Sequence, residues 1–325
     1  MHPESLGLSH TTNRSEKMIG HNDAVGVLAM RIQVDELHEG HKHLVHIAHD
    51  HCADTFIALG FHGGLRTDRD PLTFEERRAM ILETFPASMN IQIELLRDHP
   101  FSHERWCNWL DDLVASKYGN RPAVMIGSRD SFLGVYKKFG KHKTLFVEPV
   151  SDVSGSARRA AIVHSPAMSA RQAIIHNELH RPAIAYSATD IAIVNDVRQE
   201  VLGIVKNWFD GLWSLPGGFV DPERDENDES AARRERGEEL PMIKTPEAYS
   251  QLGPRIRVED PRYRKSKDKI YSSLFVTRYR GGDLTPGDDA KGARWFGRDE
   301  LKSMFVPWHQ PLLDRIIARW DDQRK

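Results

Sequence analysis

The stretch WSLPGGFVDPERDENDESAARRERGEEL, residues Trp213–Leu240, decides the fold of the second half of this chain. It runs from a Gly-Gly turn through an acidic loop into a helical segment that carries Glu235, Glu238 and Glu239. Side chains three and four positions apart share one helix face, so these carboxylates repel one another unless a cation lies between them. Hard divalent ions such as Mg²⁺ or Mn²⁺ take oxygen ligands and usually keep substrate phosphates in their shell. We therefore predict a metal site for a phosphate-containing ligand. A solvated acidic helix face is the alternative, and the LPGG turn favours the metal site.

The bulk composition describes a soluble globular protein with room for two domains. The chain has 325 residues, of which 39% are hydrophobic, and a net charge of -2. That charge gives no pull toward nucleic acid or a membrane surface. Cys52 and Cys107 are too few for a disulfide framework, which predicts a reducing, cytoplasmic location. No apolar run has the length of a membrane-spanning helix.

The first half alternates buried-strand and helix patterns. Apolar runs predict strands and 3.6-residue periodicity predicts helices, in the order strand Ala24–Met30, helix His41–Ala53, strand Thr55–Leu59, helix Thr73–Glu83 and strand Ala123–Gly127. Thr73 and Glu76 form a predicted capping box at the second helix. Strands that alternate with helices imply a Rossmann-like parallel sheet with helices on both faces.

The pattern changes near residue 182. The expected elements are strands at Ile191–Asn195, Glu200–Lys206, Ile270–Arg278 and Ala293–Phe296, and an amphipathic helix at Leu312–Trp320. Mixed strands around one acidic helix indicate a compact α/β sandwich. We predict a flexible tail at residues 1–22, a first domain at 23–183 and a second at 184–325.

A short motif, Leu37-His-Glu-Gly-His41, lies between the first predicted strand and helix. Ligands of α/β sheets bind at the carboxyl ends of strands, and a helix N-terminus attracts phosphate. His38 and His41 can donate hydrogen bonds to phosphate oxygens and to developing charge. Gly40 allows the backbone to approach a ligand closely. Two structural histidines are the alternative to this binding site.

The acidic box resembles the Nudix hydrolase signature, in which Gly is followed by five residues, Glu, seven residues and Arg-Glu-x-x-Glu-Glu. Gly218 starts the box, seven residues separate Glu226 from Arg234, and the stretch from Arg234 to Glu239 fits its end. Three positions depart from the family. Seven residues separate Gly218 from Glu226, Arg236 replaces an aliphatic residue, and Pro241 stands where Gly usually ends the motif.

This resemblance implies a Nudix α/β/α sandwich that hydrolyses a nucleoside diphosphate derivative, with ADP-ribose as the expected substrate. Glu235, Glu238 and Glu239 would be the catalytic metal ligands for Mg²⁺ or Mn²⁺. Arg234 would orient the glutamates through charge-assisted hydrogen bonds, and Gly218 would lie against the substrate.

The segment from Arg31 to His41 resembles the H-x-G-H region of the nucleotidylyltransferase superfamily. Its nicotinamide mononucleotide adenylyltransferases begin Gly-Arg-Phe-Gln-Pro-Phe-His-x-Gly-His. Arg31 matches the family's Arg, and His38 and His41 match its two histidines. Met30 replaces the family's Gly, and two extra residues intervene within Val34–Glu36.

Three further segments follow in family order. Residues Arg66–Arg77 are similar to the Pro-Phe-Thr-x-x-Glu-Arg segment that enters a helix. Residues Ile126–Asp130 resemble the Gly-His-x-Lys-Asp loop, and Val153–Arg159 resembles the Ile-Ser-Ser-Thr-x-x-Arg motif that holds the ATP phosphates. These matches assign substrate contacts to Gly127, Asp130, Ser154, Ser156 and Arg159.

Together the halves resemble the bifunctional nicotinamide mononucleotide adenylyltransferase/Nudix hydrolases. In the implied transfer, the 5′-phosphate of nicotinamide mononucleotide attacks the α-phosphorus of ATP, giving NAD and pyrophosphate. Catalysis then rests on positioning and charge stabilisation. The resemblance assigns His38 and His41 to the phosphates and the developing charge, and Arg159 to the β/γ-phosphates. Arg31 would make a supporting phosphate contact.

Two alternatives stay open at this point. In the first, the Nudix-like domain is a sensor that binds ADP-ribose or NAD without cleaving it and regulates the transferase. The altered spacing and Arg236 favour this alternative. Alternatively, the transferase takes a different mononucleotide. The expected partners are ATP, nicotinamide mononucleotide and ADP-ribose, with no nucleic acid and no membrane, and a homo-oligomer is left open.

Overall fold

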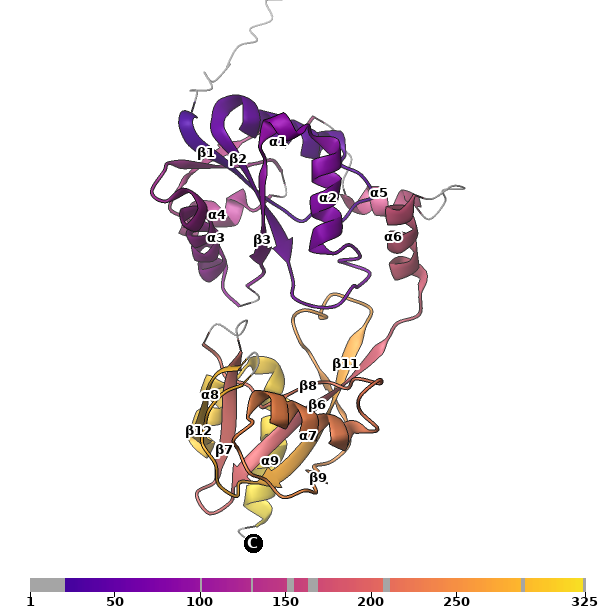
Figure 1. The fold of residues 1–325 in the computed structure, drawn as a ribbon, viewed down its shortest axis with the longest axis vertical. Coiled ribbons are helices and arrows are strands. Elements are labelled where there is room, and N and C mark those ends of the chain that lie inside the picture. Colours follow the sequence, from indigo (N-terminus) through magenta and orange to yellow (C-terminus); the bar gives the residue numbers. More distant parts are fainter. Residues whose placement is uncertain are drawn as a thin grey trace, which may run out of the picture. The chain divides into compact units, whose positions relative to one another are not determined.

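The computed structural model describes residues 21–99, 101–129, 131–150, 155–162, 169–206, 211–287 and 290–323. The chain forms two compact units (Figure 1). The first contains the described residues up to Gly63 together with Leu72–His176, and the second contains Gly64–Pro71 and the described residues from Asn177 onward. Of the tail predicted for residues 1–22, residues 1–20 lie outside the described residues. None of the described helices is both long enough and apolar enough to cross a membrane.

The first unit is built on a five-stranded sheet in the order β3-β2-β1-β4-β5, in which every neighbouring pair is parallel. Its strands are β1 His21–Met30, β2 Cys52–Phe61, β3 Gln92–Arg97, β4 Ala123–Gly127 and β5 Lys143–Phe146. The strand order reverses between β1 and β4, and ligands of open α/β sheets bind beside such a reversal, at the carboxyl ends of the strands. The predicted parallel sheet is therefore confirmed, with its switch point next to the H-x-G-H motif.

Helices cover both faces of this sheet. The helices in this part of the chain are α1 Glu39–His51, α2 Phe74–Thr84, α3 His103–Tyr118, α4 Leu133–Phe139, α5 Gly155–Ile162 and α6 Ala170–His180, whose last residues belong to the second unit, and a 3-10 turn lies at Ala87–Met89. On one face α1 comes so close to β1 that a Cβ at Gly26 would lie 3.0 Å from the Ala48 Cβ. On the other face, Leu110 of α3 and Tyr136 of α4 are buried in one cluster with β1, β2 and β4. The arrangement confirms the predicted fold class of this half.

The start of α2 confirms the predicted capping box. The Thr73 Oγ1 accepts a hydrogen bond from the Glu76 N–H at 3.3 Å, and the Glu76 carboxylate accepts one from the Thr73 N–H at 2.9 Å. Both donors would otherwise lack an intrahelical partner, so this pair fixes where the helix begins.

The second unit contains a mixed seven-stranded sheet whose main path is β10-β11-β6-β7-β12. Its strands are β6 Ala185–Asn195, β7 Glu200–Lys206, β8 Gly217–Phe219, β9 Ser250–Gln251, β10 Ile256–Val258, β11 Lys269–Arg278 and β12 Ala290–Gly297. β6 and β7 form the predicted antiparallel pair, and β11 lies parallel to β6 on its other side.

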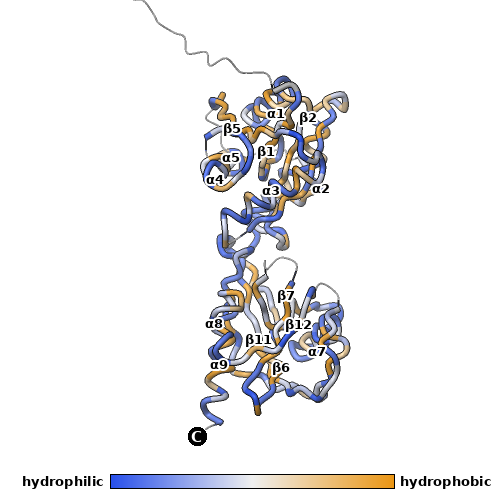
Figure 2. The backbone as a smooth tube through the Cα atoms, turned by 90° about the vertical axis from the view of Figure 1, so that its left-hand side faces the viewer, coloured by the Kyte–Doolittle hydropathy of each residue, from blue (hydrophilic) through white to orange (hydrophobic). Residues whose placement is uncertain are grey.

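Helices flank this sheet as well, which confirms the α/β/α sandwich. They are α7 Asp228–Glu239, α8 Leu301–Met304 and α9 Gln310–Asp322, with 3-10 turns at Arg298–Glu300 and Pro307–His309. Ala232 of α7 is buried with Ile191 and Ile193, whereas Ile316 of α9 is buried with Val194 on the opposite face. Figure 2 shows hydrophobic stretches along the strands of both units and a largely hydrophilic α7. Apart from its small apolar face, the surface of α7 is therefore charged.

Candidate active sites

The acidic helix of the second unit is organised by the guanidinium of Arg234. Its Nε and Nη2 donate to the two carboxylate oxygens of Asp225 at 3.0 and 2.8 Å. Its Nη1 donates to Glu235 at 2.8 Å and to Glu238 at 3.0 Å. Its Nη2 also donates to the carbonyl oxygen of Phe219 at 3.0 Å. One side chain thus joins the glycine turn, the acidic loop and two of the three glutamates.

Asp225 rather than Glu226 is the acidic partner of Arg234 in the loop. The Asp225 side chain is 2% exposed, and the Arg234 hydrogen bond holds the pKa of its carboxyl below the ordinary value. Glu226, which the signature spacing picks out, is exposed. The loop before α7 is two residues longer than in the family, so counting positions does not give the path of the chain. Sequence reasoning therefore missed Asp225, and the altered spacing was the only signal.

We expect Asp225→Asn to lower the free energy of unfolding by about 2 kcal/mol, because it weakens the charge-assisted hydrogen bonds between Arg234 and a nearly buried carboxylate. The matched variant Glu226→Gln removes a carboxylate from the neighbouring, exposed position and should change stability by no more than about 0.5 kcal/mol. Urea unfolding of both variants measures the difference. Equal effects of the two substitutions would contradict the assignment of Asp225.

The glycine turn packs directly against the acidic helix. Gly217 has φ 146°, and a Cβ there would lie 2.0 Å from the carbonyl oxygen of Thr189, so no other residue fits. A Cβ at Gly218 would lie 2.5 Å from a carboxylate oxygen of Glu235. The Gly217 N–H donates to Glu239 Oε2 at 2.8 Å. The turn therefore brings backbone groups against two of the predicted ligand carboxylates.

Glu239 is the most buried of the three glutamates, with 1% of its surface exposed. Burial raises the pKa of its carboxyl to about 7, although the ammonium of Lys206 opposes that shift. Lys206 forms an ion pair with Glu239 Oε1 and donates to the Gly217 carbonyl oxygen at 2.8 Å. Burial also raises the pKa of Glu235. Cationic partners therefore compensate the buried negative charge of this helix only in part.

The donor set fits a hard divalent ion, since three carboxylates lie on one helix face and the pKa of Glu239 marks an undercompensated charge. Across the described ranges no three His, Cys, Asp or Glu side chains already converge on a single point. The carboxylates of Glu235 and Glu238 face Arg234 instead, and that of Glu239 faces Lys206. Each of the three carboxylates therefore has a cationic partner.

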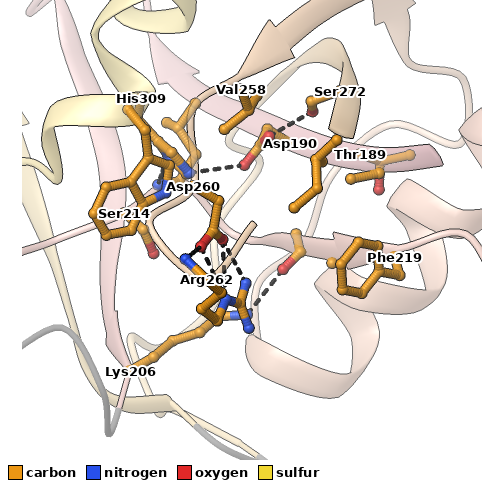
Figure 3. Close-up of a pocket in the computed structure, with 16 residues that line it drawn as sticks. Thr189, Asp190, Lys206, Ser214, Phe219, Val258, Asp260, Arg262, Ser272 and His309 are labelled. Carbon is orange, nitrogen blue, oxygen red and sulfur yellow. Dashed lines mark hydrogen bonds and ion pairs between the residues drawn. The ribbon is translucent and has the colours of Figure 1, made fainter. Parts of the chain in front are cut away.

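Beside the glycine turn lies a cavity of about 160 Å³ (Figure 3). Asp190 lies at its wall, where its carboxylate accepts from Ser272 Oγ at 2.5 Å and lies 3.5 Å from His309 Nε2. The His309 Nδ1 accepts from the Leu215 N–H at 3.3 Å, and burial lowers the pKa of this imidazole. Phe219 lies on the other side of the cavity. His309 is therefore held in one orientation, and burial favours its neutral form.

A half-buried ion pair lines the same cavity. The Arg262 Nε donates to Asp260 Oδ1 at 3.0 Å, and its Nη2 donates to Oδ2 at 2.6 Å. Asp190, Asp260 and His309 come from segments far apart in the chain, and no spacing in the sequence connects them. Lys206 and Gly217 line this cavity and also contact Glu239 of the acidic helix, so the cavity and the helix form one continuous site.

In the first unit, His38 and His41 lie together at the start of α1, as the motif predicts. His38 is the N-cap, and its Nδ1 accepts from the His41 N–H at 3.4 Å. The two rings stack with centroids 3.7 Å apart. Burial lowers the pKa of His41 to about 3, so this imidazole is neutral near pH 7, and burial also lowers the pKa of His38. The buried His41 Nδ1 has no hydrogen-bond partner within the described part of the chain.

Three further predicted site residues lie at the start of α1 and at the ends of β4 and β1. A Cβ at Gly40 would lie 3.1 Å from the His38 ring, which makes this a close approach. Gly127 ends β4 where a Cβ would lie 2.6 Å from Ser131 Oγ. Arg31 follows β1 and its guanidinium donates to Asp98 at 2.5 Å. The ends of β1 and β4 are thus neighbours at the switch point, and the Arg31–Asp98 pair links the ends of β1 and β3.

Helix α5 is tied to the loop between β1 and α1. The Arg159 Nη1 donates to the Gln33 carbonyl oxygen at 2.9 Å. The Arg158 Nε donates to Asp35 at 2.7 Å, and Gln172 donates to the same carboxylate at 2.8 Å. Burial raises the pKa of Asp35, but these hydrogen bonds outweigh it and lower the pKa. The extra residues at Val34–Glu36 thus anchor α5.

Three predicted contacts cannot be placed. Asp130 and Ser154 lie outside the described residues, and Ser156 belongs to α5 but its side chain is outside them.

A mixed sheet between helices, with a glycine turn against an acidic helix, defines an α/β/α sandwich domain with a highly charged site. Residues 186–316 match the family described as NUDIX domain. The ADP-ribose pyrophosphatase of Methanocaldococcus jannaschii is 35% identical over 139 residues, which are 43% of this chain and 75% of that protein. The chain belongs to the Nudix family.

Two solved structures align with most of the chain. A bifunctional NMN adenylyltransferase/ADP ribose pyrophosphatase from Francisella tularensis is 16% identical, with a TM-score of 0.43, over 93% of this chain and 99% of that one. A structure of such a protein from the same organism, complexed with AMP and a Mn ion, has 16% identity and a TM-score of 0.42 over the same shares.

Proposed function

We propose that the second unit hydrolyses the diphosphate linkage of ADP-ribose in a reaction that depends on Mg²⁺ or Mn²⁺. The observation that carries this proposal is the contact of Glu239 and Glu235 with the glycine turn at the mouth of the cavity. Glu235, Glu238 and Glu239 would hold the ion, which supplies Lewis-acid polarisation of phosphate and activation of water. Arg234 fixes two of these carboxylates through charge-assisted hydrogen bonds.

The cavity beside the turn would receive the remainder of the substrate. Its lining combines the aromatic rings of Phe219 and Trp308 with the polar groups of Asp190 and Arg262. Aromatic faces bury a planar base, and fixed polar groups orient ribose hydroxyls. The M. jannaschii relative, an ADP-ribose pyrophosphatase, supports the same choice of substrate.

We propose that the first unit transfers the adenylyl group of ATP to nicotinamide mononucleotide. The stacked His38 and His41 at the switch point of the sheet support this proposal. A neutral imidazole keeps one N–H that can donate a hydrogen bond to a phosphate oxygen, and burial favours the neutral form of both rings. Arg159 would bind the β/γ-phosphates and Arg31 would give a further contact. The two activities would belong to residues 23–183 and 184–325.

The test uses purified protein with ATP, Mg²⁺ and nicotinamide mononucleotide, and separately with ADP-ribose and Mg²⁺ or Mn²⁺. Chromatography resolves the products. NAD with pyrophosphate in the first reaction and AMP in the second are the expected results. Binding of ADP-ribose without release of AMP would instead identify the second unit as a sensor. Formation of the product of another mononucleotide in place of NAD would show that the transferase takes a different mononucleotide.

Arg159→Ala should raise the KM for ATP by at least about tenfold, because hydrogen bonds between charged groups contribute about 1.5–3 kcal/mol. The KM for nicotinamide mononucleotide should change less. Arg158→Ala is the matched control, since Arg158 pairs with buried Asp35 and its loss should reduce stability. Steady-state kinetics and thermal unfolding separate the two variants. An unchanged ATP KM in Arg159→Ala would show that this arginine only anchors the loop.

A further inference from the structure

The ammonium of Lys206 lies between a predicted metal ligand, the Glu239 carboxylate, and the carbonyl oxygen of Gly217. It forms an ion pair with Glu239 Oε1 and donates to the Gly217 carbonyl oxygen at 2.8 Å. The other carboxylate oxygen of Glu239 accepts from the Gly217 N–H at 2.8 Å. The Lys206 side chain is 14% exposed and that of Glu239 2%. This is a buried cation position built from one carboxylate and one backbone carbonyl.

The same two oxygen types are the ligands that a hard divalent ion selects. An ammonium and a divalent ion cannot share this position, because like charges a few ångströms apart in a partly buried site repel strongly. Arg234 does not have this relation to the site, since it binds Asp225 and the carbonyl oxygen of Phe219 as well as the glutamates. Lys206 approaches from the end of β7, so its flexible side chain can withdraw without disturbing α7.

We infer that Lys206 is an internal competitor of the divalent ion: it occupies the inner cation position in the metal-free protein and the ion displaces it. The inference rests on the proposed metal site of the hydrolase. Lys206 then stabilises the metal-free fold and weakens metal binding at the same contact. Its displaced ammonium remains within the cavity that it already lines, where the phosphate groups of a substrate would meet it.

The experiment measures Mn²⁺ binding to the full chain by isothermal titration calorimetry, without substrate. Lys206→Met keeps the length of the side chain and removes its charge, and it should tighten Mn²⁺ binding by about tenfold. Arg224→Met is the control, because Arg224 donates to Glu238 at 2.8 Å but is 57% exposed. It removes the same charge from the same group of carboxylates and should change the affinity by less than about threefold.

Thermal unfolding in a chelator gives a second readout. Lys206→Met should melt at a lower temperature than wild type, because Glu239 loses its buried partner, and Mn²⁺ should restore more stability to it than to wild type. Lys206→Gln serves the same purpose if the Met variant does not fold. Equal Mn²⁺ affinity in wild type and both neutral variants, or an equal gain in Arg224→Met, would overturn the competition. Absence of Mn²⁺ binding in every protein would overturn the proposed metal site itself.

Discussion

Glu239→Gln should lower ADP-ribose hydrolysis by more than about a hundredfold, the upper end of the losses seen for groups one shell away from a metal. The amide keeps the size of the side chain and can still accept from the Gly217 N–H, so the fold should persist. It removes the negative charge that a divalent ion needs. Because Glu239 is 1% exposed, water cannot replace the lost ligand. NAD formation should continue at the wild-type rate.

Release of AMP from ADP-ribose, followed by chromatography at saturating Mg²⁺, measures this effect. Glu226→Gln removes one carboxylate from the exposed part of the preceding loop and should leave the rate within about twofold of wild type. Hydrolysis that survives Glu239→Gln undiminished would show that the acidic helix is not the catalytic metal site. A wild-type protein that binds ADP-ribose without cleaving it would leave the sensor as the explanation.

His41→Ala should reduce NAD formation by at least about a hundredfold, in the range measured for the loss of one preorganised donor to developing charge. The stacked ring of His38 loses its neighbour, and the position at the start of α1 loses its buried imidazole. ADP-ribose cleavage should be unaffected, since the acidic helix belongs to the other unit. Pyrophosphate release from ATP and nicotinamide mononucleotide measures the change.

The control for this variant is His49→Ala, which removes an exposed imidazole from the last turn of the same helix. Its rate of NAD formation should stay within about twofold of wild type. Loss of both activities in a folded His41→Ala protein would contradict the model of two separate sites. Circular dichroism and thermal unfolding establish that the variant is folded.

Local patterns of the sequence predicted the elements that depend on neighbouring residues. The apolar run Ala24–Met30 became a buried strand, and the Thr73 capping box formed as expected because both partners lie within one turn. The hairpin of β6 and β7 followed from two apolar strands around a short turn. Helix α3 was missed, although Leu110 and Val114 recur at helical spacing within it.

The parts of the sites that the sequence did not predict depend on the path of the chain in space. Asp225 could not be distinguished from Glu226 by counting, because the longer loop changes which carboxylate reaches Arg234. Lys206 reads as the end of an ordinary strand, and its pairing with Glu239 joins residues 33 positions apart. Asp190 and His309 meet only because β6 and the turn before α9 pack together.

The pairing of β6 with β11 has a consequence for biosynthesis. Residue 185 lies beside residue 269, 84 positions later, and the two strands run parallel over ten residue pairs, so no tight turn can join them early. At about 5–20 residues per second, a ribosome needs about 4–17 seconds to add the intervening chain. During that interval one edge of β6 has no neighbour, and an unpaired strand edge is a template for association with other chains. Nascent chains paused before residue 269 should therefore be the aggregation-prone species of this protein, and the ones that engage chaperones.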